Sequence, residues 1–188
     1  MMIKHPRREL DGIIIALDAG RRTGFCYGAP GAEWPTLGTR RLATDETDLP
    51  VDVFRRADRW FGRLLAEVKP VAVVIELPIP PSNVWGATNF ATTVILIGLY
   101  AQFVGKAAAA DVRILEAPIN SWRKYFIGYG DMKGDAAKRA AKRQCRILGW
   151  EAVDDNAAEA AGIWSWGCAQ LAPSKIRRRI EPLFAGRQ

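Results

Sequence analysis

The sequence predicts a single mixed α/β domain built on a five-stranded sheet. Apolar, β-branched runs at residues 13–18 and 71–76 have the character of buried strands, and residues 51–68 have the apolar spacing of a helix. The chain has 188 residues, of which 49% are hydrophobic, which is enough for one core and short for two. We therefore expect one domain over residues 1–188, with a core at about 12–170, a basic leader at 1–11 and a basic tail at 171–188.

The first three strands are expected to form a meander. Residues 13–18 (IIIALD) end in an acid and lead into a Gly-containing turn. Residues 23–28 and 38–43 are shorter strand candidates, and the loop between them contains Pro30, Gly31 and Pro35. A loop of this kind is typical of a hairpin between antiparallel strands.

The middle of the chain alternates helices and strands. The helix at 51–68 stops at Pro70, and residues 71–76 then form an apolar run of the kind found in strands covered on both faces. A Pro-rich loop leads to a helix at 90–108 and a fifth strand at 112–115. Ser121 is a plausible cap for a short helix through residue 126. Longer helices follow at about 135–148 and 155–169, and this order describes a mixed α/β fold.

Composition restricts the possible functions. A net charge of +7 and a pI near 9.6 point to a polyanionic partner, although such an excess also serves solubility. The single histidine, His5, excludes Ser-His-Asp, Cys-His and His-rich zinc chemistry. The odd, widely spaced cysteines indicate reduced thiols in a cytoplasmic protein. The apolar stretch at 91–105 is too short for a membrane span, so no membrane insertion is expected.

The candidate chemistry lies in acids at the ends of elements. Asp18 and Glu76 close two strands, where open α/β sheets bind ligands. Asp155 and Glu159 share one face of the last helix, and Asn156 lies beside them. Clustered carboxylates suit Mg²⁺ or Mn²⁺, and two such ions support phosphodiester hydrolysis without histidine. The alternative is that these acids cap a helix and stabilise a turn.

At these residues the chain resembles the RuvC-like Holliday-junction resolvases of the RNase H-like superfamily, particularly the phage and prophage members. The resemblance rests on IIALDAGRRTGFCYG (14–28), VVIELP (73–78) and DDNAAEAAGIW (154–164), with a Trp, Gly-x-Gly and Lys-bearing segment at 122–150 between them. It implies an RNase H-like five-stranded mixed sheet flanked by helices. It also implies a bacterial or phage-infected cell and a nucleoid-associated protein.

The resemblance further implies that Asp18, Glu76 and Glu159 bind metal in a Mg²⁺-dependent junction endonuclease. The sequence departs from the family pattern at Asn156, where Asp or His is usual, and at Glu159, which replaces Asp. Asn156 can ligate through its amide oxygen, or Asp155 can supply the fourth ligand. A basic residue that assists phosphate chemistry in the family matches Lys133 or Lys138. Family members pair as dimers, which here implies a homodimer through the helix at 90–108.

A DNA surface is also predicted from the residues themselves. Along the helix at 135–148 the basic side chains share one face, while Ala137, Ala141, Cys145 and Leu148 lie on the other. An ordinary solvated face is the alternative. Near the second acid, Trp85 and Phe90 are candidates to wedge or stack on DNA bases, or else to cover the core. The candidate phosphate contacts are Arg123, Lys124, Lys133, Lys138, Arg139, Lys142, Arg143 and Arg146.

The leading hypothesis is thus a metal-dependent, crossover-junction endonuclease acting on four-way or other branched DNA. One alternative is a catalytically weak branched-DNA binder of the same fold that has lost metal affinity through Asn156 and Glu159. Another is an ATPase domain, because residues 18–24 also look like the first phosphate loop of the actin and sugar-kinase ATPases. Such enzymes need a second nucleotide-binding half, for which 188 residues leave little room.

Overall fold

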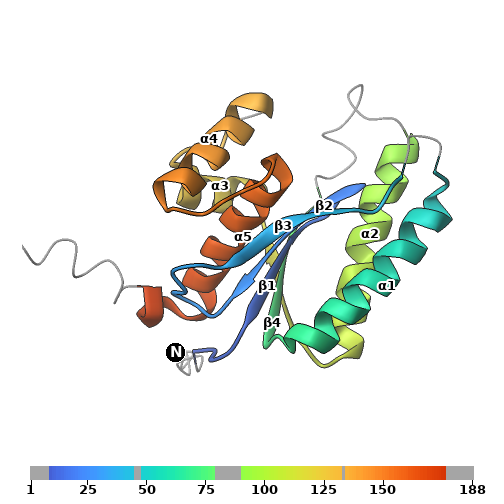
Figure 1. Ribbon diagram of the computed structural model, residues 1–188, viewed down its shortest axis with the longest axis horizontal. Coiled ribbons are helices and arrows are strands. Elements are labelled where there is room, and N and C mark those ends of the chain that lie inside the picture. Colours follow the sequence, from blue (N-terminus) through green and yellow to red (C-terminus); the bar gives the residue numbers. More distant parts are fainter. Residues whose placement is uncertain (1–8, 45–47, 79–89, 133, 177–188) are drawn as a thin grey trace, which may run out of the picture.

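The computed structural model describes residues 9–44, 48–78, 90–132 and 134–176. Helices cover both faces of one central sheet (Figure 1). The strands are β1 (Ile14–Asp18), β2 (Arg22–Gly28), β3 (Thr36–Arg41), β4 (Ala72–Glu76) and β5 (Arg113–Ala117). The helices are α1 (Pro50–Val68), α2 (Phe90–Ala109), α3 (Ile119–Ile127), α4 (Gly134–Ile147) and α5 (Asp155–Leu171).

The sheet has the order β3-β2-β1-β4-β5. β1 pairs antiparallel with β2, and β2 with β3, while the β1–β4 and β4–β5 pairs are parallel. This arrangement confirms the predicted mixed five-stranded sheet flanked by helices. β1 and β4 lie side by side at its centre, so their carboxyl ends open at the same edge.

Two hydrophobic cores lie on opposite faces of the sheet. Successive side chains of a strand alternate between faces, so Ile14 and Ala16 enter one core and Ile15 and Leu17 the other. α1 and α2 cover the second core, and α3, α4 and α5 cover the first (Figure 1). The first core also contains the three cysteines Cys26, Cys145 and Cys168, which are buried and free, and burial raises the pKa of each thiol.

Three predicted element ends were wrong. The fifth strand was expected at 112–115 but spans Arg113–Ala117, because the pairing with β4 continues to Glu76 and Ala117. The third strand was expected at 38–43 but lies two residues earlier, because Leu37 pairs with Cys26 and Leu42 already leaves the strand to bond the Arg21 carbonyl. Ser121 does not cap α3. The helix begins after Pro118, whose carbonyl accepts the N–H groups of Ser121 and Trp122.

α2 agrees with the helix expected at 90–108 to within one residue. It spans 20 residues and is long and apolar enough to cross a membrane by length and composition alone. Core helices of soluble proteins meet the same criterion, and one face of α2 packs on the sheet. Its opposite face leaves Leu96 and Ile97 exposed. The buried residues of α2 are Ile95, Leu99, Phe103 and Ala107.

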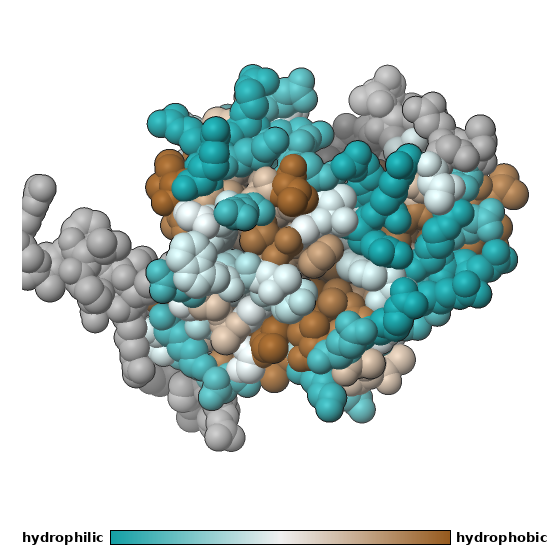
Figure 2. All heavy atoms as spheres, viewed as in Figure 1, coloured by the Kyte–Doolittle hydropathy of each residue, from teal (hydrophilic) through white to brown (hydrophobic). Residues whose placement is uncertain are grey.

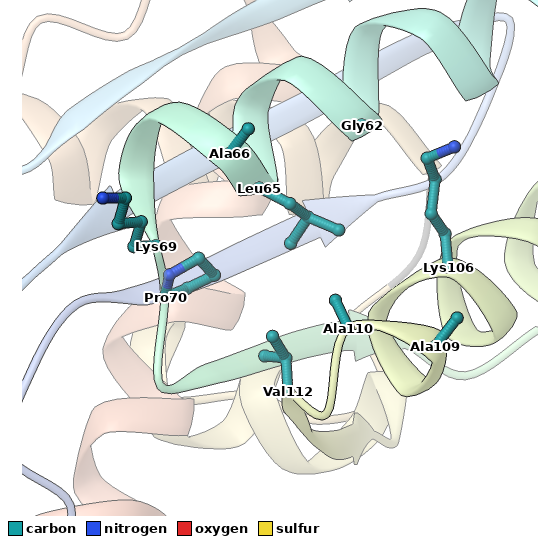
Figure 3. Close-up of a pocket in the computed structure, with 9 residues that line it drawn as sticks. All are labelled: Gly62, Leu65, Ala66, Lys69, Pro70, Lys106, Ala109, Ala110 and Val112. Atoms are coloured by element: carbon teal, nitrogen blue, oxygen red, sulfur yellow. The ribbon is translucent and has the colours of Figure 1, made fainter.

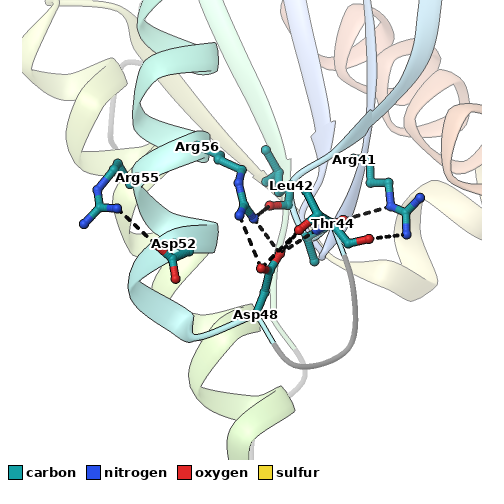
Figure 4. A network of polar contacts seen from close by, with 8 residues as sticks. Arg41, Leu42, Thr44, Asp48, Asp52, Arg55 and Arg56 are labelled. Atoms are coloured by element: carbon teal, nitrogen blue, oxygen red, sulfur yellow. Dashed lines mark hydrogen bonds and ion pairs between the residues drawn. The ribbon is translucent and has the colours of Figure 1, made fainter.

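A polar network ties the end of β3 to the start of α1 (Figure 4). The Asp48 carboxylate accepts hydrogen bonds from the Thr44 N–H at 2.5 Å and from Arg56 Nη1 at 2.6 Å. The same Arg56 nitrogen donates to the Leu42 carbonyl at 2.8 Å. The hydrogen bond from Arg56 is the main reason that the pKa of Asp48 lies well below its usual range. The network fixes where α1 starts relative to the sheet.

α5 lies directly against the strands because small residues allow the approach. At Gly24 of β2, a Cβ atom would lie 2.0 Å from the Asn156 carbonyl oxygen, and at Gly167 of α5 it would lie 2.5 Å from Val74. Any larger residue at Gly24 would therefore push the first turn of α5 off the sheet. Asp154 caps this turn by accepting the Ala157 N–H at 3.0 Å.

We expect Asp154→Ala to lower the free energy of unfolding by about 1–2 kcal/mol, the usual cost of losing an N-cap. The carboxylate also accepts hydrogen bonds from Thr39 at 2.5 Å and Arg22 at 2.8 Å, so the substitution cuts a tie between β2, β3 and α5. Urea titration of the variant checks this, with Glu67→Ala, an exposed acid of α1, as the control. Equal stability of the two variants would contradict the capping role.

Candidate active site

Asp18 and Glu76 meet at one edge of the sheet. β1 and β4 are parallel neighbours, with Leu17 paired to Ile75, so the acids that follow these two residues lie at adjacent strand ends. By the alternation of side chains, both acids fall on the α5 face rather than the α1 face. The predicted juxtaposition of the two strand-end acids is thus present.

Glu159 of α5 completes a cluster of three carboxylates. Glu159 is 7% exposed and lies in the second turn of α5. Burial and the charges of Glu76 and Glu159 raise the pKa of Asp18 well above its usual range. Burial, together with the Glu159 charge, raises the pKa of Glu76 to about 7 against the hydrogen bond from Trp122. The three groups therefore repel one another in a partly dry site.

Two consecutive residues of α3 hold two of these carboxylates. Trp122 Nε1 donates a hydrogen bond to Glu76 Oε2 at 2.7 Å. Arg123 Nη2 pairs with Glu159 Oε1 at 3.1 Å, and both side chains are nearly buried, at 13% and 10% exposure. The other terminal nitrogen of Arg123 donates to the Met132 carbonyl, and its guanidinium lies 5.3 Å from the centre of the Trp122 ring. Arg123 is thus the internal countercharge of the cluster.

Asp155, Asn156 and Lys138 lie at the rim. Lys138 Nζ is 3.3 Å from Asp155 Oδ2, and this hydrogen bond is the main reason that the pKa of Lys138 is raised. The positive charge of Lys138 also acts on Asp18 and Glu159. It partly offsets the rise in the pKa of each of these two acids. Asp155 adds to the rise in the pKa of Glu159. The structure therefore brings Asp18, Glu76 and Glu159 together and leaves Asp155 beside Lys138.

The chemistry of the carboxylate cluster fits a divalent cation, because three crowded oxygen donors repel one another until a positive charge is placed between them. Within the described residues, no three acid, histidine or cysteine side chains already converge as a metal site. Glu76 and Glu159 point instead to Trp122 and Arg123. A cation bound at the cluster would therefore compete with Arg123 for the Glu159 carboxylate.

The predicted basic face of α4 is largely exposed. Ala137, Ala141 and Cys145 are buried as expected, and hydrophilic residues gather over much of α4 in Figure 2. Lys124, on α3, is also exposed, whereas Arg123 turns inward and so differs from the surface contact that the sequence predicted. Exposed Phe90 begins α2, while Lys133 and Trp85 lie outside the described residues. A shallow depression on this side is lined by Arg139, Lys142, Arg146, Trp150 and Ala152.

A depression of about 490 Å³ lies between the ends of α1 and α2 (Figure 3). Its lining is mainly apolar, with Lys69 and Lys106 at the margin, and Lys106 is paired with Asp58 at 2.6 Å. It lies on the α1–α2 side of the sheet, away from the carboxylate cluster.

The sequence analysis missed the role of Trp122. Its ring is fully buried, yet its N–H reaches the carboxylate at the end of β4. The available signal was its position: α3 starts directly after β5, at the edge of the sheet that carries the acids. A Trp followed by an Arg in the first turns of such a helix supplies one neutral and one charged donor to that edge.

In metal-free solution we expect stability to fall as pH rises from about 4.5 to about 7. The unfolded chain loses the Glu76 proton near its ordinary pKa of 4.5, whereas the folded protein keeps it up to about 7. The folded state therefore binds more protons across this window, and stability declines with pH by on the order of 3 kcal/mol.

Thermal unfolding in EDTA between pH 4 and 8 measures this slope. Glu76→Gln should reduce this decline of stability with pH, and Glu67→Gln should leave the decline unchanged. A metal-free wild type whose Tm rises steadily through this window would contradict the assignment.

The order and direction of the five strands, with helices on both faces, are those of the RNase H-like fold. Among solved structures the chain is similar to RuvC of Thermus thermophilus, with a TM-score of 0.64 and 15% identity over 84% of this chain and 95% of that one. It is also similar to T. thermophilus RuvC in complex with a Holliday junction substrate, with a TM-score of 0.62 and 14% identity over 90% and 96% of the two chains.

A third similar structure is the yeast mitochondrial Holliday junction resolvase Ydc2, with a TM-score of 0.60 and 13% identity over 89% of this chain and 82% of that one. At the level of sequence, no protein-family model and no curated protein matches the chain. The chain therefore has the fold of the RuvC-like resolvases, which confirms the fold that the resemblance implied. The phage type stays a prediction.

Proposed function

We propose that this chain is a divalent-metal-dependent endonuclease that resolves four-way or otherwise branched DNA. The observation that carries the proposal is the crowding of Asp18, Glu76 and Glu159 at one sheet edge, beside Lys138 and the basic face of α4. The fold is shared with two resolvases, and one of the similar structures is a complex with a Holliday junction. Acids that repel one another next to a basic surface are what metal-assisted cutting of DNA requires.

In this proposal Asp18, Glu76 and Glu159 hold Mg²⁺ or Mn²⁺, with Asp155 or the amide oxygen of Asn156 as a further ligand. When bound, two such cations would activate a water molecule and stabilise the leaving oxygen. Trp122 fixes the orientation of Glu76 through its N–H. Lys138 keeps its proton, because Asp155 raises its pKa, and can neutralise a phosphate oxygen at the rim of the site.

The test is incubation of the purified chain with a labelled synthetic four-way junction and with a linear duplex of the same sequence. Each is run with Mg²⁺, with Mn²⁺ and with EDTA, alongside Asp18→Asn. The proposal expects metal-dependent paired nicks across the junction that are absent from the duplex and from the variant. Cleavage in EDTA, or equal cleavage of the duplex, would overturn it.

A second candidate, a branched-DNA binder with weak catalysis, is favoured by one observation. Two acids of α5 are already neutralised, Asp155 by Lys138 and Glu159 by Arg123, and Asn156 adds no charge. Such a chain would bind the junction tightly and leave it uncut with every metal. Isothermal titration of Mn²⁺ into the protein without DNA separates the two candidates, because only the nuclease should bind the metal.

The proposed active unit is a homodimer paired through the helix at 90–108, which corresponds to α2. Ile97 and Leu96 are exposed on the face of α2 that does not meet the sheet, and two sites related by a two-fold axis suit a four-way junction. We expect Ile97→Glu to convert a dimer into a monomer in light scattering coupled to size-exclusion chromatography. The exposed Ile147 of α4, changed to Glu, is the matched control. A monomeric wild type would contradict the pairing.

A further inference from the structure

A third depression adjoins the carboxylate cluster on the side of the β1–β2 turn. Its volume is about 450 Å³, and it joins this turn to the first turns of α4 and α5. The sequence analysis assigned no role to the turn beyond its likeness to a phosphate loop. The depression is lined by Gly20, Arg21, Arg22, Lys138, Asp154, Asp155 and Asn156.

The charges that line this depression do not balance. Arg22 pairs with Asp154 at 2.8 Å and Lys138 with Asp155 at 3.3 Å, so both acids already have a cationic partner. Arg21 is the remaining cation. Its Nη1 nitrogen is buried and finds no hydrogen-bond acceptor among the described residues. The depression thus has an excess of one positive charge and a donor without an acceptor, which favours an anion.

The position of the depression indicates which anion this is. Arg21 follows Asp18 by three residues, and Lys138, on the opposite wall, acts electrostatically on both Asp18 and Glu159. A DNA strand that places one phosphodiester at the carboxylate cluster continues past this rim with its next phosphates. Arginine is suited to such a phosphate because its planar guanidinium donates two parallel hydrogen bonds.

We infer that this depression binds a backbone phosphate adjacent to the one that is cut, with Arg21 as the principal donor. The inference rests on the proposed function and extends it, because it adds a phosphate contact on the side of the active site that carries the β1–β2 turn. Arg22 and Lys138 flank the bound phosphate and keep Asp154 and Asp155 neutralised.

The experiment measures the dissociation constants of a labelled four-way junction and of a linear duplex in EDTA, at salt concentrations from about 50 to 200 mM. Loss of one phosphate contact lowers the slope of log affinity against log salt by about 0.9. Arg21→Gln should show this loss and bind about tenfold more weakly, whereas Arg21→Lys should keep the slope because it keeps the charge. Arg63→Gln, an exposed arginine of α1 on the other face of the sheet, is the matched control.

The outcomes separate this inference from the proposed function. A wild-type slope for Arg21→Gln, or an equal loss for Arg63→Gln, would overturn the phosphate site and leave the nuclease proposal intact. A slope that depends on Arg21, together with a junction uncut in Mg²⁺ and Mn²⁺, would support the phosphate site and overturn the nuclease. A wild-type chain that binds neither DNA would overturn both. Thermal unfolding of Arg21→Gln shows that any loss is not caused by misfolding.

Discussion

Asp18→Asn should abolish metal-dependent cleavage and yet make the metal-free protein more stable. The charges of both Glu76 and Glu159 act on Asp18. In the proposed site, loss of this carboxylate removes several kcal/mol of charge stabilisation at the metal, or on the order of 10³-fold in rate. Without metal the folded protein favours the neutral form, because burial and the two neighbouring charges raise the pKa of Asp18. Asn mimics that neutral form, so the variant should gain stability over the wild type, and the gain should grow as the pH rises.

Both effects can be measured on one preparation. Junction cleavage in Mn²⁺ gives the rate, and thermal unfolding in EDTA at pH 5 and pH 8 gives the stability. The variant should gain most at pH 8, where wild-type Asp18 is most strongly driven to ionise. Glu67→Gln, which removes an exposed acid of α1, should change neither quantity. A variant that cuts at the wild-type rate, or that is less stable at pH 8, would remove Asp18 from the centre of the site.

Arg123→Met should destabilise the metal-free protein by about 3 kcal/mol, because removing one partner of a buried ion pair leaves the other charge uncompensated. For a chain of this length, that amounts to about 6–12 °C in Tm. The loss should be smaller at pH 5, where Glu159 can take up a proton, since its pKa is already raised by burial. Arg123→Lys should recover part of the stability, although lysine has one nitrogen in place of the two that bond Glu159 and the Met132 carbonyl.

The effect of divalent metal on Tm is a second test of the role of Arg123 as countercharge. A cation bound between the carboxylates replaces the missing positive charge, so Mn²⁺ should raise the Tm of Arg123→Met more than that of the wild type. Arg59→Met, an exposed arginine of α1, serves as the control for removing a charge. Equal metal-induced shifts in wild type and Arg123→Met would show that Arg123 and the metal do not compete for Glu159.

The sequence predicts the parts of this site that depend on local pattern. Asp18 and Glu76 each follow a run of buried residues, and parallel strands bring such ends together. The i, i+4 spacing of Asp155 and Glu159 predicts a shared helical face, although only Glu159 enters the cluster. Their separation arises because Lys138 holds Asp155 at the rim, and that contact depends on how α4 packs against α5.

The parts that could not be predicted depend on how helices are oriented on the sheet. In the sequence, Arg123 has the character of a surface residue that contacts phosphate. The position of α3 in the fold turns its side chain toward Glu159. The same position places the Trp122 N–H at Glu76. Orientations of this kind come from the packing of the whole first core, which periodicity in a short stretch of sequence does not encode.

The carboxylate cluster draws on both ends of the folded chain, and this has a consequence during protein synthesis. Asp18 leaves the ribosome with the first strand, but Glu159 comes with the last helix, and that helix also covers one face of the sheet. A nascent chain that has not yet released α5 has neither a closed core nor a third carboxylate. The proposed cutting activity therefore arises only when folding is complete, so an unfinished or truncated chain poses no threat to the DNA of the cell that makes it.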